Sequence, residues 1–300
     1  MRIVVALGGN ALLRRGEPVS AQAQYRNIRM AAAQLAAVAA EHDLVIVHGN
    51  GPQVGLLAVQ SGSAGAAAFP LDVLDAETEG MIGYQLELEL RNLLPPERAC
   101  ATVVTMVEVE RDDPAFAHPD KPIGAMLDDA RAIDAARAKG WSVARDGKGF
   151  RRVVASPQPR RFVELQPVRW LIDKHAIVIC AGGGGIPVVA DAEGRRHGVE
   201  AVIDKDRSAA VLAEALEADL FVIATDVDGV YLDWGTERAR RVGRVTPGEI
   251  AATAFAAGSM GPKVEAACAF AAHTRRRATI GALAQIDALV AGAAGTHIVP

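Results

Sequence analysis

Lysine is scarce in this 300-residue sequence, in which only six of the 32 Lys and Arg residues are lysines. Because arginine supplies almost all of the positive charge, a lysine kept against that bias is expected where a compact ammonium group is needed and a planar guanidinium would not fit. Three of the six lie in Gly-rich or acidic motifs, namely Lys121, Lys205 and Lys263. These three are therefore the candidates for chemistry, and the alternative for each is a solvated surface lysine.

Cysteine is also rare. The three cysteines, Cys100, Cys180 and Cys268, are odd in number, widely spaced and placed in apolar stretches. This pattern favours reduced, buried thiols over a disulfide framework or a zinc site. A reactive thiol at Cys180 is the alternative.

The sequence has no long apolar run and no block of like charge. The apolar run at residues 3–7 is broken at once by Gly8 and Gly9, so it is too short for a signal peptide or a membrane-spanning helix. Acidic and basic residues are interspersed, and the formal net charge is -4. These features argue against a nucleic acid or a membrane as a partner. We expect a cytoplasmic globular protein with one large or two modest α/β domains.

Two common nucleotide-binding patterns are missing as well. The sequence contains neither the P-loop pattern GxxxxGK[ST] nor the dinucleotide pattern GxGxxG. Walker-type ATPases and Rossmann dehydrogenases therefore lose their main support.

What the sequence does contain is an alternation of strand-like and helix-like segments. Ser20 is a candidate N-cap for the first long helix. The predicted strands are residues 3–7, 44–47, 102–109, 176–180, 220–225 and 279–283, and the other predicted helices lie around 77–94, 208–216 and 262–272. Such alternation predicts an open α/β fold, with a mostly parallel central sheet and helices on both faces.

One segment interrupts this alternation. Residues 111–159 are rich in Pro, Asp, Gly and Arg and have weak apolar periodicity. We interpret them as an inserted, protruding subdomain rather than a linker.

The strand-to-helix loops are the places to seek chemistry, because ligands of open α/β sheets bind at the carboxyl ends of the strands. Two glycine loops, at residues 8–10 and 48–52, end buried strands and would let backbone N–H groups approach an anion. Each alone could be a tight turn, and together they predict a paired anion site. His48 is interpreted as a packed histidine rather than a general base, because no carboxylate lies beside it in the sequence.

A third glycine loop and an acidic motif follow. Four consecutive glycines at residues 182–185 favour a phosphate-lining role over a plain turn. Farther on, Asp204 is interpreted as a helix cap, and Asp206 as the residue that orients Lys205 or helps to hold magnesium.

The last two motifs lie in the C-terminal third. Residues 224–231 end a strand, and their aromatic residue, Tyr231, could flank a nucleotide base. Residues 258–263 bring Lys263 to a helix start, where a bound anion would explain a cation that opposes the helix dipole. Phosphoryl transfer requires positioned cations and N–H donors around the transferred group, and glycine loops with lysines between them meet that requirement.

The chain resembles the carbamate kinases of the amino acid kinase family over essentially its whole length. The matching motifs, in family order, are VALGGNALL, HGNGPQVG, PLDVLDAETEGMIGYQLE, KPIG, CAGGGGIPVV, GVEAVIDKD, TDVDGVY, GSMGPKVEAA and a C-terminal AGT. The glycine loops indicate the superfamily, whereas KPIG on the insertion, IDKD and GSMGPK are much more specific. The chain departs from the family pattern at Arg145, Phe150 and Ala155, which all lie in the insertion.

The resemblance implies roles for individual residues. Lys205 and Lys263 would bind and neutralise the transferred phosphoryl group, Lys121 would reach in from the insertion, and Asp206 would organise the lysines. The carbamoyl moiety would be held by Gly8, Gly9, Asn10, Gly49, Asn50 and Gly51. The nucleotide side would comprise Gly183, Gly184, Thr225, Asp226, Tyr231 and Met260.

The resemblance also implies a homodimer that uses magnesium with ATP or ADP and acts on carbamate or carbamoyl phosphate. Such enzymes often serve fermentative arginine breakdown. Residues 1–203, including the insertion, would form the carbamate lobe, and residues 204–300 the nucleotide lobe. One alternative is another kinase of this fold that phosphorylates a small carboxylate. A second is a noncatalytic nucleotide- or anion-binding protein, which should have lost at least one of the three lysines.

Overall fold

Eight strands form the central sheet of the computed structural model, which describes residues 1–12, 17, 20–62, 68–127, 129–147, 149–251, 253, 255 and 260–300. The strand order is β15-β17-β16-β12-β1-β2-β9-β3. Every neighbouring pair is parallel except β16 and β17. In chain order these strands are β1 (Arg2–Leu7), β2 (Asp43–His48), β3 (Cys100–Thr102), β9 (Ile177–Ile179), β12 (Leu220–Thr225), β15 (Arg244–Val245), β16 (Arg277–Ala282) and β17 (Thr296–Ile298). The predicted mostly parallel sheet is confirmed.

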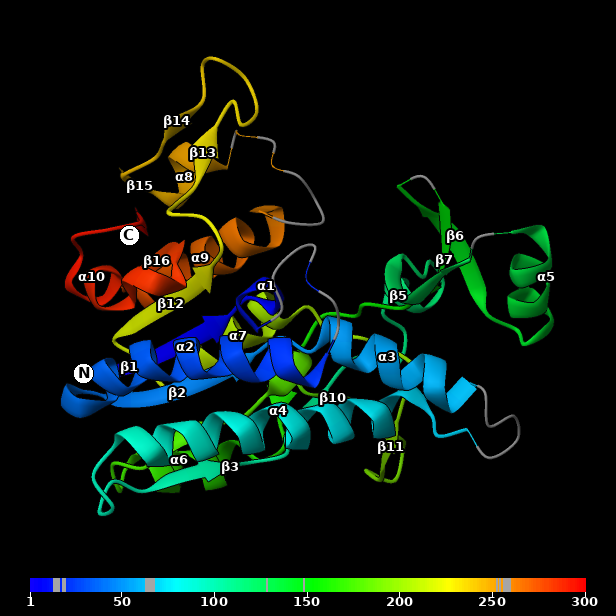
Figure 1. Cartoon of the computed structure of the whole chain (residues 1–300), viewed down its shortest axis with the longest axis horizontal. Coiled ribbons are helices and arrows are strands. Elements are labelled where there is room, and N and C mark those ends of the chain that lie inside the picture. Colours follow the sequence, from blue (N-terminus) through cyan, green and yellow to red (C-terminus); the bar gives the residue numbers. More distant parts are fainter. Residues whose placement is uncertain are drawn as a thin grey trace.

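Helices cover both faces of this sheet (Figure 1). Because side chains alternate along a strand, Val4 and Ala6 of β1 pack on one face while Ile3 and Val5 pack on the other. The first face is covered by α6 (Leu165–Ile172), α7 (Lys205–Ala215) and α9 (Met260–Thr274), and the second by α2 (Ala21–Glu41), α4 (Leu71–Leu93) and α10 (Ile286–Ala291). The central strands β1, β2, β9 and β12 are therefore buried on both sides, as their continuous apolar runs require.

The helix caps that the sequence indicates are present. Ser20 precedes α2, and its hydroxyl accepts a hydrogen bond from the Ala23 backbone N–H at 3.2 Å. Asp204 caps α7 in the same way. Helix α4 begins at Leu71, six residues before its predicted start, because its first turns bury polar side chains that hide the apolar pattern.

The predicted strand at residues 102–109 is wrong. The chain leaves the central sheet after β3 and forms β4 (Met106–Glu108) in a second, four-stranded sheet of order β11-β10-β4-β8. Its other strands are β8 (Arg161–Phe162), β10 (Ile186–Ala190) and β11 (Arg196–Gly198). At the turn, the Thr105 backbone N–H donates to Glu79 Oε2 at 2.8 Å, so a side chain of α4 takes the place of a ladder partner.

The interrupting segment forms a small sheet of its own, with the order β5-β7-β6, that protrudes from the body (green, at the right of Figure 1). It comprises β5 (Lys121–Leu127), α5 (Ala130–Ala138), β6 (Ser142–Asp146) and β7 (Gly149–Val154). Its inner edge joins the body, because Ile123 and Val154 share an apolar cluster with Val54, Leu71 and Leu74. Val54 lies on α3 (Gly51–Gly62). The other elements of the described chain are the short helices α1 (Gly9–Leu12) and α8 (Pro247–Ile250), the ribbon of β13 (Tyr231–Leu232) and β14 (Arg240–Arg241), and three 3₁₀ helices, η2 (Pro114–Phe116), η3 (Gly182–Gly184) and η4 (Leu283–Gln285).

The cysteines are free, as the sequence predicts, and Cys100 and Cys180 are buried. Burial raises the pKa of both thiols, that of Cys100 to about 12, which disfavours a reactive thiolate at Cys180. Within the described ranges, none of the helices combines the length and the apolar character that a membrane crossing requires.

Candidate active site

Two glycine loops touch one another at the carboxyl edge of the central sheet. Leu7 at the end of β1 is in register with His48 of β2, so the loops that follow the two strands start side by side. The Gly49 backbone N–H donates to Leu7 O at 3.1 Å. A Cβ at Gly49 would lie only 3.0 Å from Gly9 N and 3.3 Å from the Lys205 side chain, so the close packing favours glycine there. The Gly9 backbone nitrogen and the Lys205 side chain thus lie beside the second loop, an arrangement that suits an anion.

Lys205 and Lys263 are joined through Asp206. Lys205 Nζ lies 2.5 Å from Asp206 Oδ1, and Lys263 Nζ lies 2.8 Å from Asp206 Oδ2. The exposed fractions of the three side chains are small, at 11%, 14% and 5% in the order Lys205, Lys263, Asp206. Two ammonium groups against one carboxylate leave a net positive charge in a nearly buried site. The sequence predicted both lysines and Asp206, and the structure brings all three together.

Opposing effects set the pKa values in this triad. Burial would raise the pKa of Asp206, but the charges of Lys205 and Lys263 outweigh it and hold the pKa at about 2. Burial lowers the pKa of Lys205, while Asp206 opposes this shift. Asp206 is therefore a fixed anion that holds two ammonium groups in place.

The third lysine reaches the same helix terminus from the insertion. Lys121 Nζ at the start of β5 lies 3.2 Å from Asp204 Oδ2, and the Lys121 side chain is 39% exposed. Asp204 also caps α7, with Oδ1 accepting from the backbone N–H groups of Asp206 and Arg207 at 3.0 and 3.3 Å. All three lysines selected from the sequence thus contact the first residues of α7 or lie within them.

The third glycine loop has a backbone that few other residues could adopt. Gly183 and Gly184 have φ values of 67° and 112°, which side chains other than glycine rarely allow. The Ser208 hydroxyl of α7 donates to Gly184 O at 2.5 Å. A Cβ at Gly183 would lie 2.4 Å from Asn50 Nδ2, so this loop lies against the second one.

A buried polar layer under these loops was missed in the sequence. Asn50 Nδ2 donates to Asp75 Oδ1 at 3.1 Å and to Thr78 Oγ1 at 2.9 Å. Burial raises the pKa of Asp75 to about 8, while the hydrogen bond from Asn50 opposes the shift. The available signal was the spacing of Asp75 and Thr78, which places both on one face of a helix.

His48 and Glu79 belong to the same buried layer. Burial lowers the pKa of His48 to about 4, and its Nδ1 lies 3.3 Å from Gly49 O. This fits the interpretation of His48 as a packed, neutral histidine. Burial raises the pKa of Glu79 well above its ordinary value, and its Oε1 has no hydrogen-bond partner within the described part of the chain.

Four of the residues expected on the nucleotide side, Thr225, Asp226, Tyr231 and Met260, lie in the C-terminal third. The Thr225 hydroxyl at the end of β12 donates to Asp226 Oδ1 at 3.1 Å. The Tyr231 hydroxyl donates to Asp228 Oδ1 at 2.9 Å, and its ring lies 5.1 Å from that of Trp234. Met260 begins α9. Three expected features lie outside the described residues, namely the side chain of Asn10 and the residues Gly258 and Ser259.

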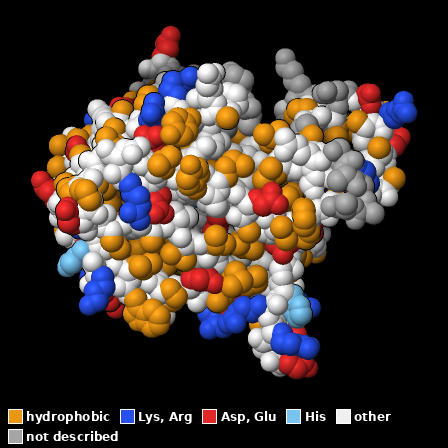
Figure 2. Space-filling view, turned by 60° about the horizontal axis from the view of Figure 1, so that its bottom comes forward, with side chains coloured by type: hydrophobic (Ala, Val, Ile, Leu, Met, Phe, Trp, Pro, Cys, Tyr) orange, Lys and Arg blue, Asp and Glu red, His pale blue; other side chains and the backbone are white. Residues whose placement is uncertain are grey.

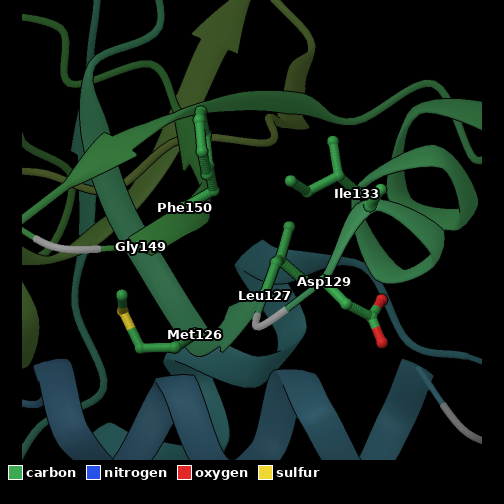
Figure 3. Close-up of a pocket in the computed structure, with 7 residues that line it drawn as sticks. Met126, Leu127, Asp129, Ile133, Gly149 and Phe150 are labelled. Atoms are coloured by element: carbon green, nitrogen blue, oxygen red, sulfur yellow. The ribbon is translucent and has the colours of Figure 1, made fainter.

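A separate pocket of about 450 Å³ lies in the insertion and contains none of the three lysines. It is lined by Met126, Leu127, Asp129, Ala130, Ile133, Gly149 and Phe150. Leu127, Ile133 and Phe150 point toward one another from three elements (Figure 3). The cradle formed by the glycine loops and lysines is therefore distinct from this pocket.

No dedicated metal cluster supplements the cradle in the described ranges. Groups of three or more His, Cys, Asp or Glu side chains that could hold a metal ion do not occur among the described residues. Both carboxylate oxygens of Asp206 accept from lysines, which favours its role in orienting them over the alternative role in holding magnesium.

Comparison with known proteins places this geometry in a family. The model of the amino acid kinase family matches residues 1–282. The chain belongs to the amino acid kinase family. The carbamate kinases of Rhizobium meliloti and Haemophilus influenzae are 55% and 53% identical to it, over 99% of this chain and 93% and 96% of theirs. The relationship to carbamate kinases that the motifs indicated is thus confirmed.

Solved structures agree with this assignment. Carbamate kinase from Giardia lamblia bound to AMP-PNP superimposes with a TM-score of 0.92 at 36% identity, covering 99% of this chain and 98% of that one. N-acetylglutamate synthase from Neisseria gonorrhoeae, at 16% identity and a TM-score of 0.60, shares the fold alone.

Proposed function

We propose that this protein transfers a phosphoryl group reversibly between carbamoyl phosphate and ADP, giving carbamate and ATP. The observation that carries the proposal is the triad in which Lys205 and Lys263 are held by opposite oxygens of Asp206 beside two touching glycine loops. The identity to carbamate kinases over 99% of the chain supports the choice of substrate.

The mechanism requires charge stabilisation rather than covalent catalysis. In the transition state of phosphoryl transfer, negative charge spreads over the equatorial and bridging oxygens. The ammonium groups of Lys205 and Lys263 would neutralise that charge, and the N–H groups of the glycine loops would orient the oxygens. Asp206 remains ionised throughout and keeps the ammonium groups aligned, because its pKa lies at about 2.

The two substrates would approach the triad from opposite sides. The carbamoyl group would be held by Gly8, Gly9, Asn10, Gly49, Asn50 and Gly51. The nucleotide would contact Gly183, Gly184, Thr225, Asp226, Tyr231 and Met260. In this division residues 1–203 form the carbamate lobe and residues 204–300 the nucleotide lobe. The two lobes share the central sheet, because β1 of the first lobe pairs with β12 of the second.

Magnesium would enter with the nucleotide. It commonly binds through substrate phosphates, water and one or two carboxylates rather than an all-protein cage, which fits a chain whose described residues lack a three-ligand cluster. When bound, it would neutralise charge on the phosphate oxygens. Asp226, exposed directly after β12, is the carboxylate among the proposed nucleotide residues.

The insertion at residues 111–159 would act as a lid. It brings Lys121 to Asp204, and a lid that excludes water would protect a labile mixed anhydride during transfer. Because carbamoyl phosphate is an activated anhydride, net flow would run toward ATP. Fermentative arginine breakdown, in the cytoplasm, is the setting that this direction suits.

A homodimer is part of the proposal. Met81 and Tyr84 on α4, with Val104 after β3, are exposed at 37%, 62% and 47%. Figure 2 shows hydrophobic side chains spread over the face where α4 comes forward. A second copy of the chain would cover this surface, and neither a nucleic acid nor a membrane is proposed as a partner.

A coupled assay tests the function. The protein should form ATP from ADP and carbamoyl phosphate only when magnesium is present, and acetylglutamyl phosphate should be a far poorer donor. The comparison addresses the other candidate, a kinase of this fold that acts on a larger carboxylate. Equal use of the two donors would contradict the proposal.

A further inference from the structure

The buried layer beneath the second glycine loop has no part in the charge stabilisation described above. Asn50, Asp75 and Thr78 are exposed by only 2%, 4% and 0%. Burying polar side chains costs free energy unless they are hydrogen-bonded. The bonds in this layer therefore determine how its side chains are oriented.

These bonds favour one orientation of the Asn50 amide. The Thr78 hydroxyl donates its single hydrogen to Asp75 O at 2.9 Å, so toward Asn50 its oxygen can only accept. Asn50 Nδ2 lies 2.9 Å from that oxygen and 3.1 Å from Asp75 Oδ1. A rotated amide would set the Asn50 oxygen against the Thr78 oxygen. Both amide hydrogens of Asn50 are therefore held by α4.

The amide oxygen of Asn50 is the atom left for a ligand. The residues that the structure describes supply no hydrogen-bond donor to it. The amide lies against Gly183, where a Cβ would come within 2.7 Å of Asn50 Oδ1, and the preceding Gly49 lies against Gly9 and Lys205. Asn50 thus stands beside the cradle with an acceptor whose orientation is fixed.

We propose that Asn50 Oδ1 accepts a hydrogen bond from the amino group of the carbamoyl substrate, and that Asp75 and Thr78 are positioning residues that hold the amide for this contact. The inference rests on the proposed function, because it requires an acyl phosphate that carries an amino group. Acetyl phosphate has a methyl group at that position and leaves the Asn50 oxygen unpaired. A site built to bind a substrate N–H rejects an analogue that lacks it.

The test uses a matched pair of variants on α4. Thr78→Val keeps the shape of the side chain but removes the acceptor, so one amide hydrogen of Asn50 loses its partner and the amide is free to rotate. Thr78→Ser keeps the hydroxyl and serves as the control. The measurements are kcat/KM for carbamoyl phosphate, the KM for ADP, and the inhibition constant of acetyl phosphate as a competitor.

Thr78→Val should lower kcat/KM for carbamoyl phosphate by about 10- to 100-fold, the range expected for one misplaced hydrogen bond. The inhibition constant of acetyl phosphate and the KM for ADP should change by no more than about twofold, since neither ligand uses this contact. Thr78→Ser should stay close to the unsubstituted protein.

The inference would be overturned if Thr78→Val weakened the inhibition by acetyl phosphate as much as it lowered kcat/KM for carbamoyl phosphate. An unchanged kcat/KM for carbamoyl phosphate in Thr78→Val would also overturn it. If circular dichroism shows that Thr78→Val is unfolded, Thr78→Ala provides the same comparison. Failure of the proposed function gives a different result, because the unsubstituted protein would then form no ATP from carbamoyl phosphate.

Discussion

Individual lysines carry the proposed chemistry, and their removal gives the most direct prediction. Lys205→Ala or Lys263→Ala should lower turnover by roughly 10² to 10⁵, the range found when one transition-state cation or donor is removed. Lys→Arg should restore little, because a planar guanidinium does not fit a site shaped around Asp206 and an ammonium. Steady-state kinetics of each variant, with circular dichroism to verify folding, provides the measurement.

The exposed Lys174 offers a matched control for these substitutions. Lys174→Ala should keep the activity of the unsubstituted protein. If a folded Lys205 or Lys263 variant retained more than about a tenth of the activity, a loss below that expected for a transition-state cation, that lysine would be structural.

The buried acids make a second prediction, about stability and pH. Burial raises the pKa of Asp75 to about 8, whereas an unfolded aspartate titrates near 3.9. Between these values the folded state holds the extra proton, so the free energy of unfolding should fall as pH rises toward 8. Burial also raises the pKa of Glu79, which changes the free energy of unfolding in the same direction. His48, with its pKa lowered to about 4, has the opposite effect, because below a pH of about 6.5 the unfolded histidine binds a proton that the folded one does not. Above that pH only the effect of the buried acids remains.

Asp75→Asn should flatten this dependence. Each proton that differs between the two states contributes up to about 1.4 kcal/mol per pH unit. Urea unfolding at pH 6.5, 7.2 and 8.0 measures the slope, with the exposed Asp134→Asn as the control. If the Asp75→Asn variant kept the slope of the unsubstituted protein, Asp75 would already be ionised in the folded state.

At the scale of elements, the sequence predicted what local patterns determine. The caps of α2 and α7, the strand β12 and the lysine at the start of α9 depend on neighbouring residues and were found. The break between β3 and β4 was not predicted. It depends on the hydrogen bond from the Thr105 backbone N–H to Glu79, and Glu79 is distant from Thr105 in the sequence. Asp75 and Thr78 were missed for a different reason, because polar residues on one helix face usually indicate solvent.

The insertion provides the prediction at this scale. Replacing residues 111–159 with a short Gly/Ser linker should leave ADP affinity within a few fold, because the proposed nucleotide residues lie outside it, while transfer falls by orders of magnitude. The replacement also uncovers Val54, Leu71 and Leu74. Lys121→Ala in the intact chain is therefore the cleaner partner variant, with Lys139→Ala as its control in the same insertion.

Calorimetric titration of ADP and the coupled assay would be run on all three variants. A linker variant that folds, binds ADP and turns over normally would show that the lid is not needed. If Lys121→Ala kept full activity while the linker variant lost phosphoryl transfer, the insertion would act by excluding water rather than through its lysine.

At the scale of the whole molecule, the exposed apolar residues Met81, Tyr84 and Val104 lie on a face that a second chain could cover, and the last prediction concerns that contact. Sedimentation should give a mass about twice the 31.4 kDa of one chain, since exposed apolar patches of this kind mark interfaces. Met81→Glu with Tyr84→Glu places two charges on the exposed side of α4 and should produce monomers. Trp234→Glu, at an exposed residue following β13, is the control and should leave the dimer intact. A dimer that survives the α4 substitutions but not Trp234→Glu would place the interface on the opposite end of the molecule, beside the proposed nucleotide residues.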